Sequence, residues 1–422
     1  MKKIVTIVLL SILFITSCTK EDDGIQKEEE NKVENFIGAR SVNSGVPSNE
    51  DIYASPSIIY NSSKDKNADG SKDHPHSLRK ALTLVTAGKT LWMRGGIYKF
   101  TITNDYYYPI LTNDGTENNR ITIESYPNEV AVIEGTKSDW DKEKGTPYKS
   151  FRVRGNYTTI RNIEIRNNAG FGLYIKGHHV IVEGLKTYHN IQTGISNLGA
   201  NNIIRDNFSY ENSDYGYQTS NEVYDNGDNA DGIGSPLGTD GTVIEHNVVY
   251  GNSDDGIDVF YASNVVIEYN KAYWNGKQKD GSPYTKPDFK GNGQGIKLGG
   301  TDSKNNIGRH NIAFQNKASG FDVSERSNFN CTMAYNTSWD NGDVGFVNIN
   351  NANNKVEHNI ALKNTNGSTA LRKYHQNNYV DEIDNSWQRI GDVEFISTDQ
   401  SSADFLRPKK GSGFEDIGAY NK

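Results

Sequence analysis

A short asparagine repeat restricts the possible folds of this chain more than any other feature of its sequence. Two asparagines separated by four residues recur, and one further copy has Leu185 in the first place and Asn190 in the second. Five of the seven spacings between copies are 22–25 residues, and the other two, 40 and 41, equal one repeat plus an insertion of about 17 residues. Such a fixed period is typical of a solenoid. The full copies are Asn162/Asn167, Asn207/Asn212, Asn247/Asn252, Asn270/Asn275, Asn311/Asn316, Asn336/Asn341 and Asn359/Asn364.

Each repeat contains short runs with the alternation of a β-strand, such as TVIEHNVVYGN and VVIEYNKAYWN. In these runs Val and Ile would point inward, while Glu, His and Lys would point outward. Three short strands in 22–25 residues predict an all-β fold, a right-handed parallel β-helix in which equivalent asparagines form hydrogen-bonded ladders. The regular Leu spacing of a leucine-rich repeat is absent. The 41 glycines among 422 residues fit a fold with many tight turns.

The two ends of the repeat region depart from the period. Residues 78–86, LRKALTLVT, predict a short amphipathic helix that covers the open N-terminal end before a first strand over 90–98. Residues 365–422 are expected to cap the other end. We therefore predict one β-helix domain over residues 51–422, preceded by a charged and polar flexible tether over 19–50.

Residues 1–18 have the pattern of an export signal, with two lysines followed by an apolar run. Thr16 and Ser17 before Cys18 resemble the lipobox of bacterial lipoproteins, and the acidic stretch that follows resembles the surface-export tag of Bacteroidetes lipoproteins. The resemblance implies lipidation at Cys18 and an outer-membrane lipoprotein exposed at the cell surface. The alternative is an ordinary secretory signal and a periplasmic or secreted protein. Only Cys331 remains, so no intrachain disulfide is expected.

The charge balance argues against a nucleic-acid partner, because 45 basic and 53 acidic residues give a net charge of −8 without a basic block. The electrostatic field of a chain with this net negative charge would not attract an acidic substrate either. Binding such a substrate would require local cations, either metal ions or a few placed lysines and arginines.

Glycines open one strand in each coil, and the register of these glycines gathers charged residues on one face. Asp231 and Asp255 each precede such a glycine one coil apart, and Asp254 adjoins Asp255. Asp258 and Lys297 take the outward-facing position of successive coils. The insertions near 213–230 and 276–292 would flank this group and wall a groove.

Four carboxylates in such proximity repel one another unless a cation lies among them. Charged oxygen ligands suit Ca²⁺, whereas Zn²⁺ would normally require His or Cys. We therefore expect a calcium site formed by Asp231, Asp254, Asp255 and Asp258. Lys297 is a candidate general base, although the neighbouring carboxylates would raise its pKa.

The segments NGDNADG, NSDDGIDVF and GQGIKLGG, in this order, resemble polysaccharide lyase family nine, which includes pectate lyases. The resemblance extends over about residues 55–420 and includes the N-terminal coils. It implies a right-handed β-helix in which the four aspartates bind calcium and Lys297 is the catalytic base. The implied substrate is an acidic plant cell-wall polysaccharide, with homogalacturonan and rhamnogalacturonan I both open, and a capped solenoid is expected to be a monomer.

The corresponding reaction is β-elimination, in which a base removes the C5 proton of a uronate while cations neutralise its carboxylate. Because four aspartates and one Ca²⁺ leave about two negative charges, a second cation or a basic residue such as Lys290 or Arg309 is a candidate bridge to the substrate. Two other functions stay open at this point. One is a β-helix glycoside hydrolase that uses paired aspartates, and the other is a non-catalytic surface protein that binds glycans.

Overall fold

The computed structural model describes residues 42–101, 108–140, 149–217, 226–300, 302–322, 330–347, 354–365 and 393–420. The predicted export signal, Cys18 and most of the predicted tether lie outside these residues. Within the described ranges, no helix has both the length and the apolar character that crossing a membrane requires.

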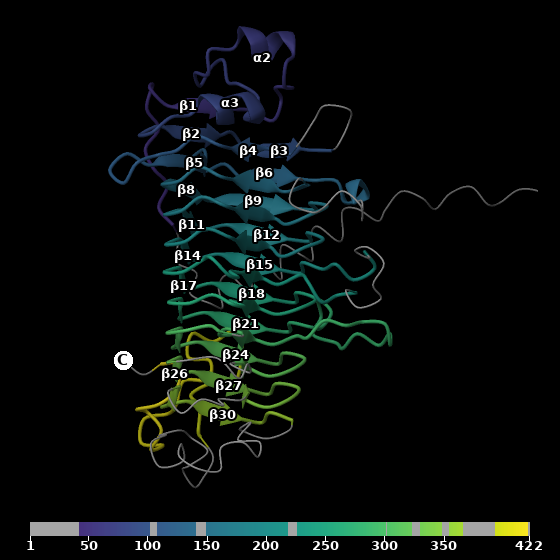
Figure 1. The fold of residues 1–422 in the computed structure, drawn as a ribbon, viewed down its shortest axis with the longest axis vertical. Helices are drawn as coiled ribbons and strands as arrows, with labels where there is room; N and C mark the ends of the chain where they lie inside the picture. The colour runs from purple at the N-terminus through teal and green to yellow at the C-terminus, as the bar shows by residue number, and fades with distance from the viewer. Residues whose placement is uncertain are drawn as a thin grey trace, which may run out of the picture.

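The chain forms a parallel β-helix whose coils stack from the N-terminal to the C-terminal end (Figure 1). Each full coil gives one strand to each of three parallel sheets, which confirms the predicted fold class. In the described residues the first sheet holds β1 Ile52–Ala54, β2 Thr90–Met93, β5 Ile121–Ser125, β8 Thr158–Arg161, β11 Ile181–Glu183, β14 Ile203–Arg205, β17 Val243–Glu245, β20 Val266–Glu268, β23 Ile307–Arg309, β26 Thr332–Ala334 and β29 Lys355–Glu357.

The second sheet holds β3 Gly96–Lys99, β6 Ala131–Glu134, β9 Ile163–Arg166, β12 Lys186–Tyr188, β15 Phe208–Tyr210, β18 Val248–Tyr250, β21 Lys271–Tyr273, β24 Ile312–Phe314, β27 Thr337–Trp339 and β30 Ile360–Leu362. The third sheet holds β4 Ile110–Leu111, β7 Phe151–Val153, β10 Leu173–Ile175, β13 Ile195–Asn197, β16 Ile233–Gly234, β19 Ile257–Asp258, β22 Ile296–Lys297, β25 Phe321–Asp322 and β28 Phe346–Val347. The predicted strand over 90–98 is two strands, β2 and β3, in different sheets.

The predicted asparagine ladders are present, and both are buried. In the turn between the first and second sheets, the amide of each asparagine from Asn207 to Asn336 donates to the Oδ1 of the next at 2.9–3.1 Å. A second ladder runs from Asn190 to Asn364 in the turn between the second and third sheets. At the N-terminal end the prediction is off by one residue, because Asn168, not Asn167, donates its backbone N–H to Asn190.

The residue before each first-ladder asparagine has a left-handed backbone conformation. In the six coils from Asp206 to His358 its φ is 55–58°, although none of these residues is a glycine. This conformation costs about 1–2 kcal/mol per residue. The amide hydrogen bonds offset that cost in every coil. Asn162 has the same conformation, with φ 56°, which explains why it stands one place outside the ladder.

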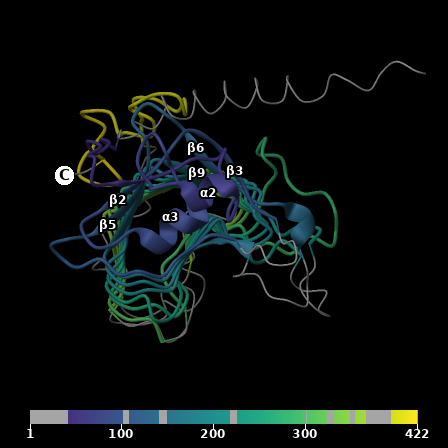
Figure 2. The same ribbon diagram turned by 90° about the horizontal axis from the view of Figure 1, so that it is seen from above.

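The ends of the solenoid are covered differently. The predicted N-terminal helix is α3, Leu78–Leu84, whose N-cap Ser77 accepts a hydrogen bond from the backbone of Lys80. Leu78, Ala81 and Leu82 are buried, whereas Leu84 is exposed. Figure 2, which looks down the stack, shows the helix over the interior of the coils. The short helix α2, Ser63–Asn67, and the 3₁₀ helix Lys137–Asp139 complete the helical segments of the described chain.

At the other end, residues 393–420 pack on the outer side of the second sheet. Phe405 contacts the ring of Phe314, with centroids 4.9 Å apart, and Gly418 donates its backbone N–H to His358. The predicted C-terminal cap is therefore a lateral cover in its described part. Residues 366–392, which belong to the same prediction, lie outside the described residues.

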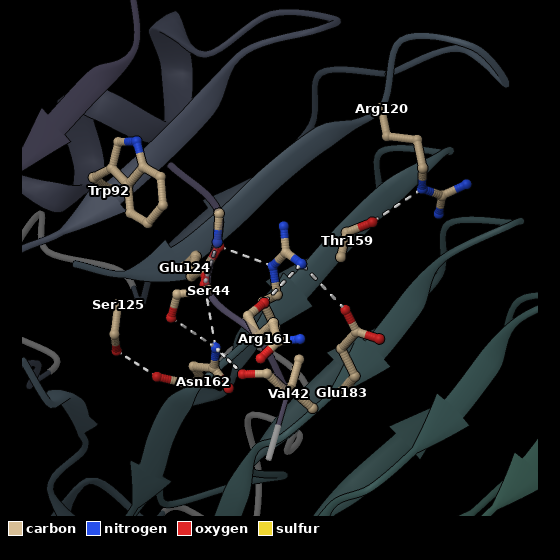
Figure 3. Close-up of polar contacts among 12 residues, drawn as sticks. Val42, Ser44, Trp92, Arg120, Glu124, Ser125, Thr159, Arg161, Asn162 and Glu183 are labelled. Carbon is tan, nitrogen blue, oxygen red and sulfur yellow. Dashed lines mark hydrogen bonds and ion pairs between the residues drawn. The ribbon is translucent and has the colours of Figure 1, made fainter. Parts of the chain in front are cut away.

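A segment before β1, residues 42–48, runs along the outer face of the first sheet. We call it the N-terminal strap (Figure 3). Gly45 donates its backbone N–H to the buried Glu124 at 3.3 Å, and Arg161 donates to the carbonyl of Asn43 at 3.4 Å. Tyr53 donates its hydroxyl to the carbonyl of Ser48 at 3.0 Å. In this part of the predicted tether, the chain already contacts the β-helix.

Candidate active site

The third sheet positions the charged residues through a strict alternation. Ile257 and Ile296 point into the core, so the residues that follow them, Asp258 and Lys297, point outward. The two are paired in register on adjacent strands. The glycine before each strand allows close stacking, since a Cβ on Gly256 would lie 2.4 Å from the carbonyl oxygen of Gly295. The repeat itself therefore sets the spacing of the site.

Three aspartates lie in the turns that enter these strands. Carboxylate oxygens of Asp231, Asp254 and Asp255 all lie within 4.8 Å of one another. Asp254 and Asp255 are buried and Asp231 is partly buried. Backbone N–H groups at the end of the second insertion and just after it hold two of them, because Asn292 donates to Asp254 and Gln294 donates to Asp255, both at 2.7 Å.

Lys297 contacts both a member of the three-aspartate group and the outward-facing Asp258. Its Nζ lies 3.2 Å from Oδ2 of Asp258 and 3.7 Å from Oδ2 of Asp255. It also lies 4.8 Å from the ring centroid of Phe260. The structure thus brings together all five residues singled out in the sequence, with Asp258 beside the lysine and the other three aspartates as a tighter group.

Burial and mutual repulsion make this cluster unfavourable in its fully charged form. Burial first, and then the charges of Asp258 and Asp255, raise the pKa of Asp231 well above its usual value. Burial raises the pKa of Asp255 to about 7, although the positive charge of Lys297 acts in the opposite direction. Burial would lower the pKa of Lys297, but the charges of Asp258, Asp255 and Asp231 outweigh it and raise that pKa.

The three-aspartate group fits a hard divalent cation. Its donors are carboxylate oxygens, the ligands that Ca²⁺ prefers. Oδ2 of Asp255 is buried and accepts no hydrogen bond from the described residues. A cation among these oxygens would relieve the repulsion that raises the pKa values of the three carboxyl groups.

The two insertions pack against each other beside the cluster and project from the same side of the stack in both ribbon views (Figures 1 and 2). Asn226 of the first donates its amide to Asp288 of the second at 3.2 Å, and Lys290 donates its backbone N–H to the carbonyl of Asn226. Tyr215 contacts both Tyr284 and Phe289. Residues 218–225 of the first insertion lie outside the described residues.

Two residues near the cluster were not singled out in the sequence. Asp322 follows Lys297 in register on β25 and accepts a hydrogen bond from the side chain of Gln294 at 2.6 Å. Lys317 donates its Nζ to the carbonyl of Gly291, and burial lowers its pKa. The position of Asp322 near the cluster could have been predicted from the sequence, because this residue occupies the outward position of its coil. Lys317 belongs to no repeated position of the third sheet.

One suggested substrate contact is wrong. Arg309 lies on β23 in the first sheet, where its guanidinium pairs with Glu268 of the preceding coil, and not on the face of the acidic cluster. The sequence alone does not show to which of the three sheets the strand of Arg309 belongs. Lys290 lies in the second insertion and is exposed.

The model of the Pel9A-like, right handed beta helix region matches residues 58–378, and the chain belongs to this family.

Curated relatives and solved structures agree with this membership. The chain is 30% identical to pectate lyase PEL9 of Emericella nidulans over 87% of this chain and 94% of that protein. It is 30% identical to pectate lyase L of Paenibacillus polymyxa over 64% of this chain and 60% of that protein. The crystal structure of pectate lyase Pel9A is 26% identical, covers 88% of this chain and 90% of its own, and gives a TM-score of 0.67.

A rhamnogalacturonan lyase structure shares the fold, with 18% identity, 87% and 99% coverage of this chain and its own, and a TM-score of 0.64. The chain is therefore a polysaccharide lyase. This membership favours the lyase over the glycoside hydrolase and over the non-catalytic surface protein.

Proposed function

We propose that this protein cleaves a galacturonate-containing pectic polymer by calcium-dependent β-elimination, with Lys297 as the base. The observation that carries the proposal is the position of the lysine amine within 3.7 Å of two aspartates, one of which belongs to the buried three-aspartate group. The pectate lyase relatives support an acidic polysaccharide substrate.

The residues have distinct roles in this reaction. Asp231, Asp254 and Asp255 would hold the calcium ion, with Asp258 as a fourth carboxylate beside Lys297. A calcium ion held there would supply two positive charges, which offset the carboxylates that keep Lys297 protonated and stabilise negative charge on the substrate carboxylate. Lys297 would remove the proton from C5 of the uronate.

The step balances without an oxidant or water. The C5–H electron pair becomes the second bond of a C4–C5 double bond, and the bond from C4 to the glycosidic oxygen breaks. That oxygen leaves with its electron pair on the neighbouring sugar and takes up a proton there. The products are a new reducing end and an unsaturated uronate, whose double bond absorbs ultraviolet light.

Ultraviolet absorbance with polygalacturonate and with rhamnogalacturonan I, with calcium or with a chelator, tests the proposal. We expect a calcium-dependent rise on at least one polymer, which Lys297→Ala removes. Lys279→Ala changes an exposed lysine of the second insertion and serves as the matched control. Release of reducing ends without ultraviolet absorbance would instead indicate hydrolysis, and activity that persists in Lys297→Ala would exclude this lysine as the base.

We also propose that the chain is exported as a lipoprotein anchored through Cys18, on the strength of its N-terminal pattern. Labelling with a fatty-acid analogue in a bacterial host should mark the wild-type chain and not Cys18→Ala. Export of both proteins without label would leave an ordinary secretory signal.

A further inference from the structure

One buried carboxylate near the acidic cluster has no part in the reaction described above. Asp214 is fully buried, yet it lies outside the group of three aspartates whose oxygens are within 4.8 Å of one another. It stands two residues after Asn212 of the second asparagine ladder, which is the place that Asp254 takes after Asn252 in the next coil. Asp214 therefore occupies, one coil earlier, the same position as an expected calcium ligand.

Asp214 lies where the first insertion leaves its coil, and it binds the place where the insertion returns. Its Oδ2 accepts a hydrogen bond from the side-chain amide of Asn229 at 3.2 Å. A second bond closes the insertion next to it, because Gly216 donates its backbone N–H to Oδ1 of Asn226 at 2.7 Å. The two ends of the insertion are thus held together at its base, two residues before Asp231.

The other oxygen of Asp214 is bound from the following coil. Its Oδ1 accepts a hydrogen bond from the hydroxyl of Ser253 at 3.0 Å, and Ser253 is fully buried. Ser253 comes directly before Asp254. One carboxylate thus connects residues 229–231 with residues 253–255, and these two segments carry all three aspartates of the group.

The length of the first insertion explains why such a connection matters. The glycine that opens a strand of the third sheet follows its ladder asparagine by four residues from Asn252 to Gly256, but by 20 residues from Asn212 to Gly232. A longer connection has more conformations to lose, so the chain alone determines less well where Asp231 lies. Hydrogen bonds at the base of the insertion remove this freedom just before that aspartate.

A carboxylate suits this place because both of its oxygens accept hydrogen bonds. Burial raises the pKa of Asp214 to about 6, although the bonds from Asn229 and Ser253 act in the opposite direction. The group is therefore mainly ionised at neutral pH, and hydrogen bonds to an ionised acceptor are stronger than those between neutral groups.

We infer that Asp214 is a positioning residue: by joining the base of the first insertion to Ser253, it places Asp231 in the three-aspartate group. The inference rests on the proposed function, because the same aspartates are expected to hold the calcium ion there. Asp214 acts through its two hydrogen-bond partners and not as a ligand. Ligands that are already ordered bind a cation more tightly than ligands that binding has to order, so loss of these bonds should weaken calcium binding.

Isothermal titration calorimetry of the purified protein with Ca²⁺ tests the inference independently of activity. We expect Asp214→Ala, which removes both acceptors, to raise Kd by at least about 10-fold. Asp214→Asn should raise Kd much less, because its amide can accept from Asn229 and donate to the hydroxyl of Ser253. Asp280→Ala, at an exposed aspartate of the second insertion, is the matched control and should change Kd by less than about twofold, since exposed charges are screened.

Asn229→Ala tests the same connection at an exposed residue and without a change of charge. It should raise Kd in the wild-type background and have little further effect in Asp214→Ala, because the two residues act through one bond. Thermal unfolding in chelator verifies that each variant is folded.

An unchanged Kd in Asp214→Ala would overturn the inference. Equal Kd values for Asp214→Asn and Asp214→Ala, with no effect of Asn229→Ala, would also overturn it, because they would show an effect of charge alone. Wild-type protein that binds no Ca²⁺ would reject the calcium site of the proposed function, and the inference with it.

Discussion

The coils of this protein stack two kinds of buried polar row at the same spacing. In the asparagine ladder between the second and third sheets, each amide donates to the next at 2.9–3.0 Å. In the acidic turn, only three residues after Asn252 in the chain, Asp255 stacks beside Asp231. An amide is both donor and acceptor, so identical amides satisfy one another, whereas identical carboxylates repel. A uniform row stabilises the fold, whereas an acidic row would be stabilised by an external cation or by protonation.

Asp255→Asn tests the acidic row and should have the largest effect on activity. The amide retains an oxygen to accept the N–H of Gln294 but loses the charge that would bind calcium. We expect kcat/KM to fall by at least about 10²-fold. In chelator, the variant should unfold at a higher temperature than wild type, because a buried like charge is gone. A lower midpoint in chelator would show that repulsion in this row is not a cost to the fold.

Asn247→Ala tests a uniform row in the other asparagine ladder, which lies between the first and second sheets and away from the acidic cluster. Its side chain donates to Asn270 and to the carbonyl of Ile204, and accepts from Asn207. Because the variant leaves buried partners unpaired, we expect a loss of about 3 kcal/mol in the free energy of unfolding. Denaturant unfolding measures it, with the exposed Asn118→Ala as control. Calcium affinity should be unchanged, and a large fall in affinity would mean that the two rows are not independent.

The pH dependence of the stability of the wild-type protein should distinguish the acidic row from the asparagine ladder. An unfolded aspartate has a pKa of 3.8, whereas folding raises the pKa of Asp255 to about 7, mainly through burial. Burial also raises to about 6 the pKa of Asp214, a residue of the first insertion outside the acidic row. Between these values the folded protein binds more protons than the unfolded chain, so its stability falls as pH rises from about 4 to 7. Thermal unfolding in chelator should show this decline, and calcium should reduce it. A midpoint that rises over this range in chelator would contradict the assignment.

A third row of side chains, on the first sheet, alternates between negative and positive charge. A substitution in this row should have the smallest effect on stability. Arg161 lies between Glu124 and Glu183, and Arg205 lies between Glu183 and Glu245, with closest N–O distances of 2.7–4.0 Å. Because Arg205 is partly exposed, Arg205→Met should lower the free energy of unfolding by only about 1 kcal/mol. Lys355→Met, in a more exposed pair with Glu357, is the control and should have a smaller effect. A loss equal to that of Asn247→Ala would remove the distinction between this row and the ladder.

The periodic part of the molecule was predictable from the sequence, and the part that breaks the period was not. The glycine that opens each strand of the third sheet was enough to place Asp258 beside Lys297, because the register of a strand determines which of its side chains point outward. The asparagine repeat was wrong at Asn167, because the residue that joins the ladder in this coil is Asn168. It also could not exclude Arg309, since assigning a strand to one of three sheets requires the turns to be placed first.

The strap depends on contacts that no repeat specifies. One of its partners is Glu124, a buried carboxylate at the position of an ordinary outward strand residue in the sequence. Such a contact follows from the three-dimensional arrangement and not from the spacing of any one residue type.

The strap also determines where a mechanical load would enter the molecule. Residues 42–48 run from the coil of Gly184, where a Cβ would touch the side chain of Val42, back toward Trp92 and Tyr53 near the first coils. A pull transmitted through Val42 would therefore act in shear along several coils before it reached the N-terminal cap. Shear loads many hydrogen bonds at once, whereas peeling breaks them one after another. A load on Val42 would thus reach the first coils only after the contacts of the strap have broken.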